Sequence, residues 1–157
     1  MKYVVARWEE SHRGFWTDPR EYLRRLAEFR DRLPEGARRF ATDPAHYDFP
    51  GERCVKDLRL SEIGMSAMDV GALRLVFSPN PWKHVSGLVV EYTGVRRVDI
   101  VEDEHPWDED EGYGTVLLDE ILPVEGGCSH EFALSGSSVR IECADLDARW
   151  LEPSAER

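Results

Sequence analysis

The chain has 157 residues, a hydrophobic content of 41% and a formal net charge of −11. This composition excludes a disordered chain, and the length fits one domain that folds without a disulfide or a metal. The charge is uneven, because residues 1–60 carry 13 basic and 11 acidic side chains whereas residues 61–157 carry 7 and 20. Such a field favours a basic partner and repels polyanions, so we expect no nucleic-acid partner and no membrane partner.

The first expected elements are a short strand and one amphipathic helix. The β-branched and aromatic run at residues 2–8 predicts a strand. A helix is expected over about residues 18–33, with Asp18 as its N-cap and Pro34 just after its last turn. Its apolar stripe consists of Tyr22, Leu26, Phe29 and Leu33. The segment 37–52 has two prolines, one glycine and no hydrophobic period, which predicts a loop.

From residue 53 to residue 151 apolar and polar residues alternate. Runs rich in Val, Ile, Leu and aromatic side chains are separated by turn residues, which predicts about seven short strands. Two prolines at 79–81 exclude a central-strand position, and SGSS at 135–138 predicts a tight hairpin. The pattern favours an α+β fold with a mainly antiparallel sheet or sandwich. We expect one domain over 1–157, made of an α-containing part (1–50) and a β-rich part (53–151).

The cysteines and the apolar runs predict the compartment. Cys54, Cys128 and Cys143 are an odd set at long spacings without a CxxC pair, which indicates reduced, buried thiols. No run approaches the roughly 20 apolar residues of a membrane span, and the apolar run near the start is too short for a signal-peptide core. A cytoplasmic location is expected.

No motif of a familiar enzyme class is present. GxSxG, HExxH, the phosphate-binding P-loop and the dinucleotide-binding GxGxxG are all absent, so we assign no catalytic residue and no cofactor. His130 alternates with Cys128 and Phe132 on one strand face, which favours a packed side chain. The sequence leans against an enzyme, but a site assembled from separated residues stays open. Its candidates are His46, Tyr47, His84 and His130.

Residues 101–114, VEDEHPWDEDEGYG, form what we call the acidic segment, with seven carboxylates and no Lys or Arg. A calcium loop starting at Asp108 fails, because Gly112 and Tyr113 fall where a ligand and a glycine are needed. We therefore assign no metal, although weak cation binding and a merely solvated turn stay open. Clustered carboxylates attract a basic protein, and aromatic neighbours become interface anchors. The candidate partner-binding residues are Glu102, Asp103, Glu104, Trp107, Asp108, Glu109, Asp110, Glu111 and Tyr113.

The strand series over residues 55–147 contains KDLRLSEI, LRLVF, GLVVEYTGVRRVDI, LLDEIL, HEFAL and VRIECADL. It resembles small bacterial proteins, including immunity-protein families of polymorphic toxin systems. The resemblance implies a non-enzymatic binder that neutralises a basic toxin by covering its active site. We therefore expect an acidic binding protein, with a small enzyme or ligand-binding protein as the alternative. A further alternative is a homodimer formed through an exposed sheet.

Overall fold

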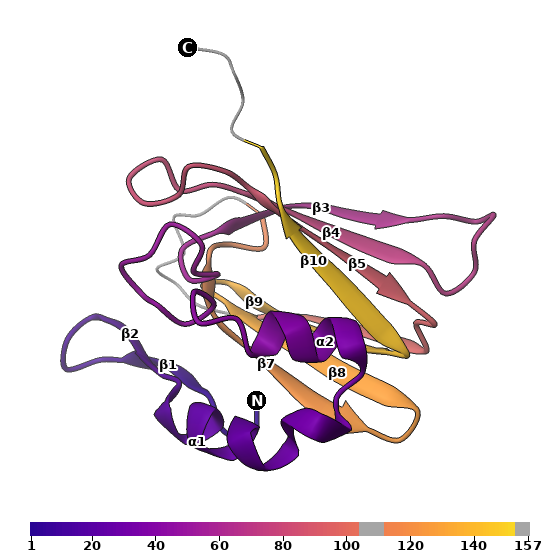
Figure 1. Cartoon of the computed structure of the whole chain (residues 1–157). Coiled ribbons are helices and arrows are strands. Elements are labelled where there is room, and N and C mark those ends of the chain that lie inside the picture. The colour runs from indigo at the N-terminus through magenta and orange to yellow at the C-terminus, as the bar shows by residue number, and fades with distance from the viewer. Residues whose placement is uncertain (104–111, 153–157) are drawn as a thin grey trace.

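The computed structural model describes residues 1–103 and 112–152, which form a mainly β fold with two short α-helices (Figure 1). A hairpin comprises β1 (Val5–Glu9) and β2 (Gly14–Asp18). Sheet I has the order β10–β5–β4–β3, with β3 (Arg59–Met65), β4 (Leu73–Ser78), β5 (Leu88–Thr93) and β10 (Asp145–Trp150). Sheet II has the order β6–β9–β8–β7, with β6 (Arg97–Glu102), β7 (Val116–Val124), β8 (Gly127–Leu134) and β9 (Ser137–Cys143). Neighbouring strands pair antiparallel, which confirms the α+β class and the predicted antiparallel pairing.

The described residues form ten strands, so the predicted number of about seven is wrong. The short strand β2 was not predicted, and the run 137–150 is two strands, β9 and β10, that lie in different sheets. The chain crosses between the sheets at Ala144, beside Gly94, where the β5–β6 connection crosses in the opposite direction. Gly94 has φ +59°, and a Cβ there would lie 2.7 Å from the Ala144 Cβ. This corner therefore requires glycine.

The predicted helix over 18–33 is wrong in its extent. Helix α1 (Arg20–Phe29) is followed by the 3₁₀ turn η1 (Arg30–Arg32), and a second helix, α2 (Glu35–Ala41), occupies part of the predicted loop. The break occurs at Leu33, which is extended (φ −73°, ψ 145°) because a proline ring disfavours helical geometry in the residue before it. Pro34 then becomes the N-cap of α2, and Pro19, not Asp18, is the N-cap of α1. The predicted apolar stripe is buried, as expected.

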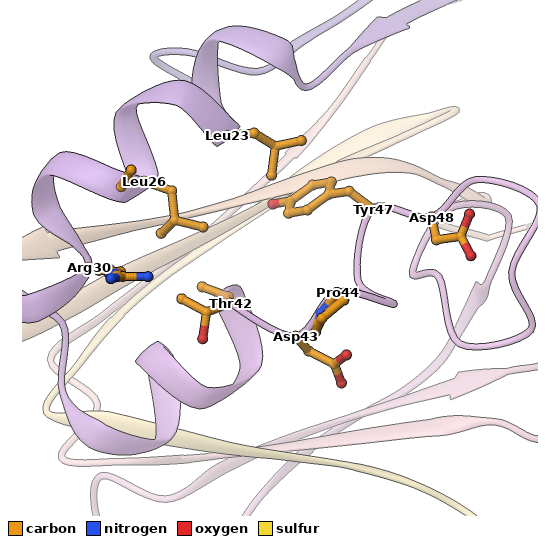
Figure 2. Close-up of a pocket in the computed structure, with 10 residues that line it drawn as sticks. Leu23, Leu26, Arg30, Thr42, Asp43, Pro44, Tyr47 and Asp48 are labelled. Carbon is orange, nitrogen blue, oxygen red and sulfur yellow. The ribbon is translucent and has the colours of Figure 1, made fainter.

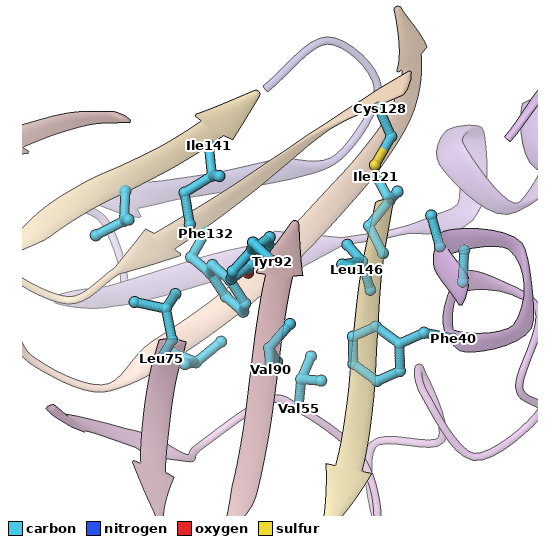
Figure 3. Close-up of a cluster of buried hydrophobic side chains, with 14 of the residues drawn as sticks. Phe40, Val55, Leu75, Val90, Tyr92, Ile121, Cys128, Phe132, Ile141 and Leu146 are labelled. Carbon is cyan, nitrogen blue, oxygen red and sulfur yellow. The ribbon is translucent and has the colours of Figure 1, made fainter. Parts of the chain in front are cut away.

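The core lies between the inner faces of sheets I and II (Figure 3). The Phe77 and Phe132 rings meet across the two sheets with centroids 5.0 Å apart. Tyr92 from sheet I and Ile141 from sheet II are also fully buried in this layer. Phe40 of α2 enters the same core from the side. The short helix is thus held by packing, which explains why the hydrophobic period of the sequence did not reveal it.

Helix α2 begins against β10. The Asp145 carboxylate of β10 accepts hydrogen bonds from the backbone N–H groups of Gly36 (3.0 Å) and Ala37 (2.9 Å). It thereby supplies the capping acceptor that the helix lacks locally, since Pro34 makes no side-chain cap. A Cβ on Gly36 would lie 1.8 Å from the backbone oxygen of Leu146, so the helix and the strand are in backbone contact there.

We expect Gly36→Ala to destabilise the protein by about 1–3 kcal/mol, the usual cost of overpacking. Whether the free energy of unfolding falls or rises is informative. Alanine is a better helix former than glycine by roughly 1 kcal/mol, so the substitution would stabilise an unobstructed helix. The free energy of unfolding in urea measures the effect. Gly14→Ala is the matched control, because the nearest heavy atom to its new Cβ would be the His12 oxygen at 3.8 Å. A Gly36→Ala variant as stable as the wild type would contradict the close contact.

Cys54, Cys128 and Cys143 are buried free thiols, which confirms the interpretation of the cysteines. The Sγ atoms of Cys128 and Cys143 lie 3.6 Å apart on neighbouring strands. Within residues 1–103 and 112–152, none of the helices has the length and apolar content that crossing a bilayer demands.

Candidate functional site

Four polar side chains from distant parts of the chain meet in the core, and we call them the buried polar cluster. Asp119 of β7 and His130 of β8 lie on the inner face of sheet II. Tyr92 of β5 reaches them from sheet I. His46 comes from the connection between α2 and β3. All four are at most 1% exposed, so the cluster is part of the protein interior.

Asp119 is the centre of the cluster. His46 Nε2 lies 2.8 and 2.9 Å from its two carboxylate oxygens, and His130 Nε2 lies 2.8 Å from Oδ2. Burial alone would raise the pKa of Asp119. The adjacent positive charge of His46 and the hydrogen bonds from both imidazoles nevertheless hold that pKa well below its ordinary value of 3.8. Asp119 is therefore an ionised carboxylate in the core.

His46 is doubly protonated. Its Nδ1 donates to the Phe40 carbonyl oxygen at 3.0 Å, and its Nε2 donates to the Asp119 carboxylate. Neither partner has a proton to give, so both ring nitrogens must carry one. Burial opposes this charge, but the Asp119 carboxylate and the hydrogen bonds raise the pKa of His46 above its ordinary value of 6.5.

His130 is neutral. Its Nε2 donates to Asp119, while its Nδ1 accepts a hydrogen bond of 2.8 Å from the Tyr92 hydroxyl. Burial lowers the pKa of His130 below its ordinary value of 6.5, and the positive charge of His46 acts in the same direction. The cluster thus contains one anion, one cation and two neutral groups. The charges of Asp119 and His46 neutralise each other. The imidazole and Tyr92 hydroxyl protons all form hydrogen bonds to protein atoms.

A cavity of about 340 Å³ lies between α1 and the connection that follows α2 (Figure 2). Leu23 and Leu26 of α1 form one wall, and the ring of Tyr47 forms another. The Tyr47 ring stacks on His46 with centroids 4.3 Å apart, and its hydroxyl donates to the Asp119 backbone oxygen at 2.9 Å. Tyr47 therefore lies between the cavity and the cluster. A substrate in this cavity would meet the Tyr47 ring and not the imidazole nitrogens that acid–base catalysis needs.

The structure brings together three of the four residues of the predicted assembled site. His46, Tyr47 and His130 surround Asp119, whereas His84 lies elsewhere, donating from Nε2 to the Cys54 backbone oxygen at 2.8 Å. Among residues 1–103 and 112–152, no group of three or more His, Cys, Asp or Glu side chains is arranged to hold a metal ion.

Three of the nine predicted partner-binding residues lie at one end of sheet II. Glu102, Asp103 and Tyr113 belong to the described residues, where the first two are exposed and Tyr113 packs against the core. Glu104, Trp107, Asp108, Glu109, Asp110 and Glu111 lie outside the described residues. The Asp103 N–H donates to the Gly136 oxygen at 2.9 Å, and Ser137 Oγ donates to the Tyr113 oxygen at 2.8 Å. Both ends of the acidic segment therefore contact the β8–β9 turn.

No family model matches this chain, and no curated protein is similar enough to be counted as a relative.

Sequence reasoning missed Asp119, the residue that organises the cluster. The signal was the pair Asp119–Glu120 inside the apolar run VLLDEIL, since neighbouring strand residues point to opposite faces. Asp119 faces the core, whereas the 2%-exposed Glu120 accepts hydrogen bonds from the backbone N–H groups of Lys2, Tyr3 and Val4 at 2.6, 2.6 and 2.8 Å. Two acids in a buried strand are costly unless each has such partners, so their presence predicts a polar network.

Proposed function

We propose that this protein is a non-catalytic acidic binding protein that captures a basic protein partner at the end of sheet II. The observation that carries the proposal is the attachment of the acidic segment. Asp103 and Tyr113, at its two ends, contact Gly136 and Ser137 of one tight turn. The turn is also paired with the start of β7 through reciprocal hydrogen bonds between Thr115 and Ser135, of 2.9 and 2.8 Å. The two described ends of the acidic segment thus contact the same turn.

The charge distribution supports a basic partner. Residues 98–139 contain no Lys or Arg, so the acidic segment lies within a longer acidic stretch. The exposed Glu102 and Asp103 extend this charge onto the end of β6. A surface of one sign accelerates encounter with a partner of the other sign. An inhibitor or immunity protein for a basic toxin is the form of this function that the resemblance of the strand series suggests.

The alternative, an enzyme or small-ligand protein, is favoured by one observation, the cavity beside Tyr47. It ranks second because the polar atoms of the buried polar cluster contact protein atoms and not the cavity. A homodimer formed through an exposed sheet would be detected by light scattering.

Reversing the charge of Asp108, Glu109, Asp110 and Glu111 to Lys tests the proposed function. We expect the affinity for the basic partner to fall at least about 100-fold, because like charges facing each other across an interface cost several kcal/mol. The partner is first captured from a lysate of the organism that encodes this chain, identified by mass spectrometry and purified. Its dissociation constant is then measured by calorimetry for each variant.

The matched control reverses four exposed acids elsewhere, in the variant with Asp31, Glu52, Asp69 and Glu125 changed to Lys. It changes the net charge by the same amount as the acidic-segment variant. A difference in affinity between the two variants therefore reports a local contact and not the net charge of the protein. We expect this control to retain most of the affinity and both variants to melt within a few degrees of the wild type. Retained affinity in the acidic-segment variant would contradict the proposed function.

A further inference from the structure

Among the described residues, β6 is the one outer strand of the two sheets that is both regular and uncovered. Strand β10 packs against helix α2 (Figure 1). The edge of β7 is covered by Tyr22, whose hydroxyl donates to the Ile121 oxygen at 2.9 Å and accepts the Ile121 N–H at 3.3 Å. Strand β3 has a bulge between Leu60 and Glu62. Bulges and covering elements keep an edge strand from pairing with another molecule, and β6 has neither.

The outer edge of β6 presents backbone groups that can pair with another strand. Strand β6 pairs with β9 over Arg97–Glu102 without a register shift, and the Asp103 N–H continues this ladder to the Gly136 oxygen at 2.9 Å. In an antiparallel ladder only alternate residues bond to a given neighbour, so the even-numbered residues of β6 direct their N–H and C=O groups away from β9. These residues are Val98, Ile100 and Glu102. In the part of the chain that the structure describes, no strand pairs with these groups. Ile100 is 39% exposed and Val101 is 55% exposed, so the edge also presents apolar surface.

We propose that β6 pairs with the β6 strand of a second copy of this chain, antiparallel about a twofold axis, so that the two copies of sheet II form one continuous sheet. The outward groups belong to even-numbered residues in both copies, so an even-numbered residue must face an even-numbered one. The twofold axis then lies at a single residue, which faces itself. With the axis at Ile100, Val98 faces Glu102 of the second copy, and all three outward residues form backbone hydrogen bonds.

The charges of β6 select this register. Arg97, Asp99 and Asp103 point to the outer face of the sheet, because they alternate with Val98, which packs against the core. With the axis at Ile100, Arg97 faces Asp103 of the second copy, and the symmetry produces this pair of opposite charges twice. An axis one residue earlier would place Asp99 opposite itself, and an axis one residue later would place Asp99 opposite Asp103. Like charges that face each other destabilise a sheet, so both neighbouring registers are disfavoured.

The antiparallel arrangement also separates the acidic ends of the two strands. Asp103 of one copy faces Arg97 of the other, so the two Asp103 residues are six positions apart along the paired strands. At about 3.4 Å per residue this separation is roughly 20 Å, which exceeds the Debye length of about 8 Å at physiological ionic strength. The two acidic ends therefore repel each other only weakly. The dimer goes beyond the proposed function, because it requires no basic partner.

Sedimentation equilibrium of the full chain over the micromolar range tests the dimer, and we expect the wild type to show a monomer–dimer equilibrium. Arg97→Glu should raise the dissociation constant of the dimer about 10-fold, because it turns two attractive pairs into repulsive ones. Asp103→Arg should have a similar effect. The double variant Arg97→Glu, Asp103→Arg has the net charge of the wild type and should recover most of the affinity. Arg7→Glu is the matched control, since Arg7 is also an exposed strand arginine that contacts an acid two positions later, Glu9, at 2.8 Å. It should dimerise like the wild type.

Ile100→Pro tests the backbone pairing separately from the charges. Proline removes an N–H that points away from β9, and edge strands tolerate proline at such positions, so the variant should fold and sediment as a monomer. A wild type that is monomeric throughout the range, or a dimer that persists in Ile100→Pro, would overturn the inference. An equal loss of affinity in Arg97→Glu and Arg7→Glu would also overturn it, because the effect would then come from net charge. A double variant that fails to recover affinity would show that Arg97 and Asp103 do not face each other.

Discussion

Asp119→Ala is expected to lower the free energy of unfolding by about 3–5 kcal/mol, the usual cost of removing one partner of a buried ion pair. The variant would leave His46 as a buried cation without its carboxylate, and His130 without the acceptor for its Nε2 proton. His46 would then have to lose a proton to remain inside, and one ring nitrogen would have no hydrogen bond. Urea denaturation of the purified variant measures the loss.

Asp69→Ala is the matched control for this prediction. Asp69 is an exposed aspartate in the β3–β4 connection, where a substitution is expected to change stability by no more than about 0.5 kcal/mol. Asp119→Asn keeps the shape of the side chain but not its charge, so its loss should be smaller than that of Asp119→Ala. If Asp119→Ala and Asp69→Ala were equally stable, the central role of Asp119 in the core would be wrong.

The contribution of the buried polar cluster to stability is expected to be largest near pH 6.5, the ordinary histidine pKa. His130 has a lowered pKa, so its contribution is complete above pH 6.5 and is lost as the pH falls below that value. Asp119 has a lowered pKa, so its contribution begins to be lost as the pH falls below 3.8 and is gone below its folded-state pKa. His46 has a raised pKa, so its contribution is complete below pH 6.5 and is lost as the pH rises through its folded-state pKa.

Two variants show which histidine causes the loss of stability on each side of pH 6.5. We expect His46→Gln to remove the loss of stability above pH 6.5, and His130→Gln to remove the loss that begins just below pH 6.5. Each titration contributes a slope of up to about 1.4 kcal/mol per pH unit, so the difference from the wild type is measurable by urea denaturation across pH. Nitrogen chemical shifts of the two imidazoles in the wild type provide an independent measurement. A His46 ring found neutral at pH 6.5 would contradict the assignment.

Those parts of the fold that depend on local pattern could be predicted from the sequence. Alternation gave most strands of the β-rich part, and the 135–138 hairpin is the real β8–β9 turn. Helix α2 and the crossing at Ala144 could not be predicted in the same way. Helix α2 depends on capping by Asp145, which is 109 positions from Gly36, and the crossing depends on which sheet each strand joins. Neither contact produces a hydrophobic periodicity that could be recognised in the sequence.

The candidate site, like the fold, could be predicted from the sequence only in part. The sequence identified His46, Tyr47 and His130 as side chains that could meet, and they do meet. It did not identify the carboxylate between them, because Asp119 sits in an apolar strand where the pattern predicts only packing. His84 was included on residue type alone, and its hydrogen bonds are instead to the backbone of Asn80 and Cys54. Residue types suggested the members of the cluster, but only the register of β7 and β8 determines which of them touch.

The hydrogen bond between His46 and Asp119 joins residues 73 positions apart and ties the irregular connection between α2 and β3 to the centre of the sandwich. The connection also pairs with itself, since the Val55 N–H donates to the His46 oxygen. We therefore expect the Val55 amide, whose acceptor belongs to His46, to exchange with solvent hydrogen mainly through openings that also disrupt the core. The part of the connection that is held by His46 should therefore unfold together with the strands around it, although it has no regular secondary structure.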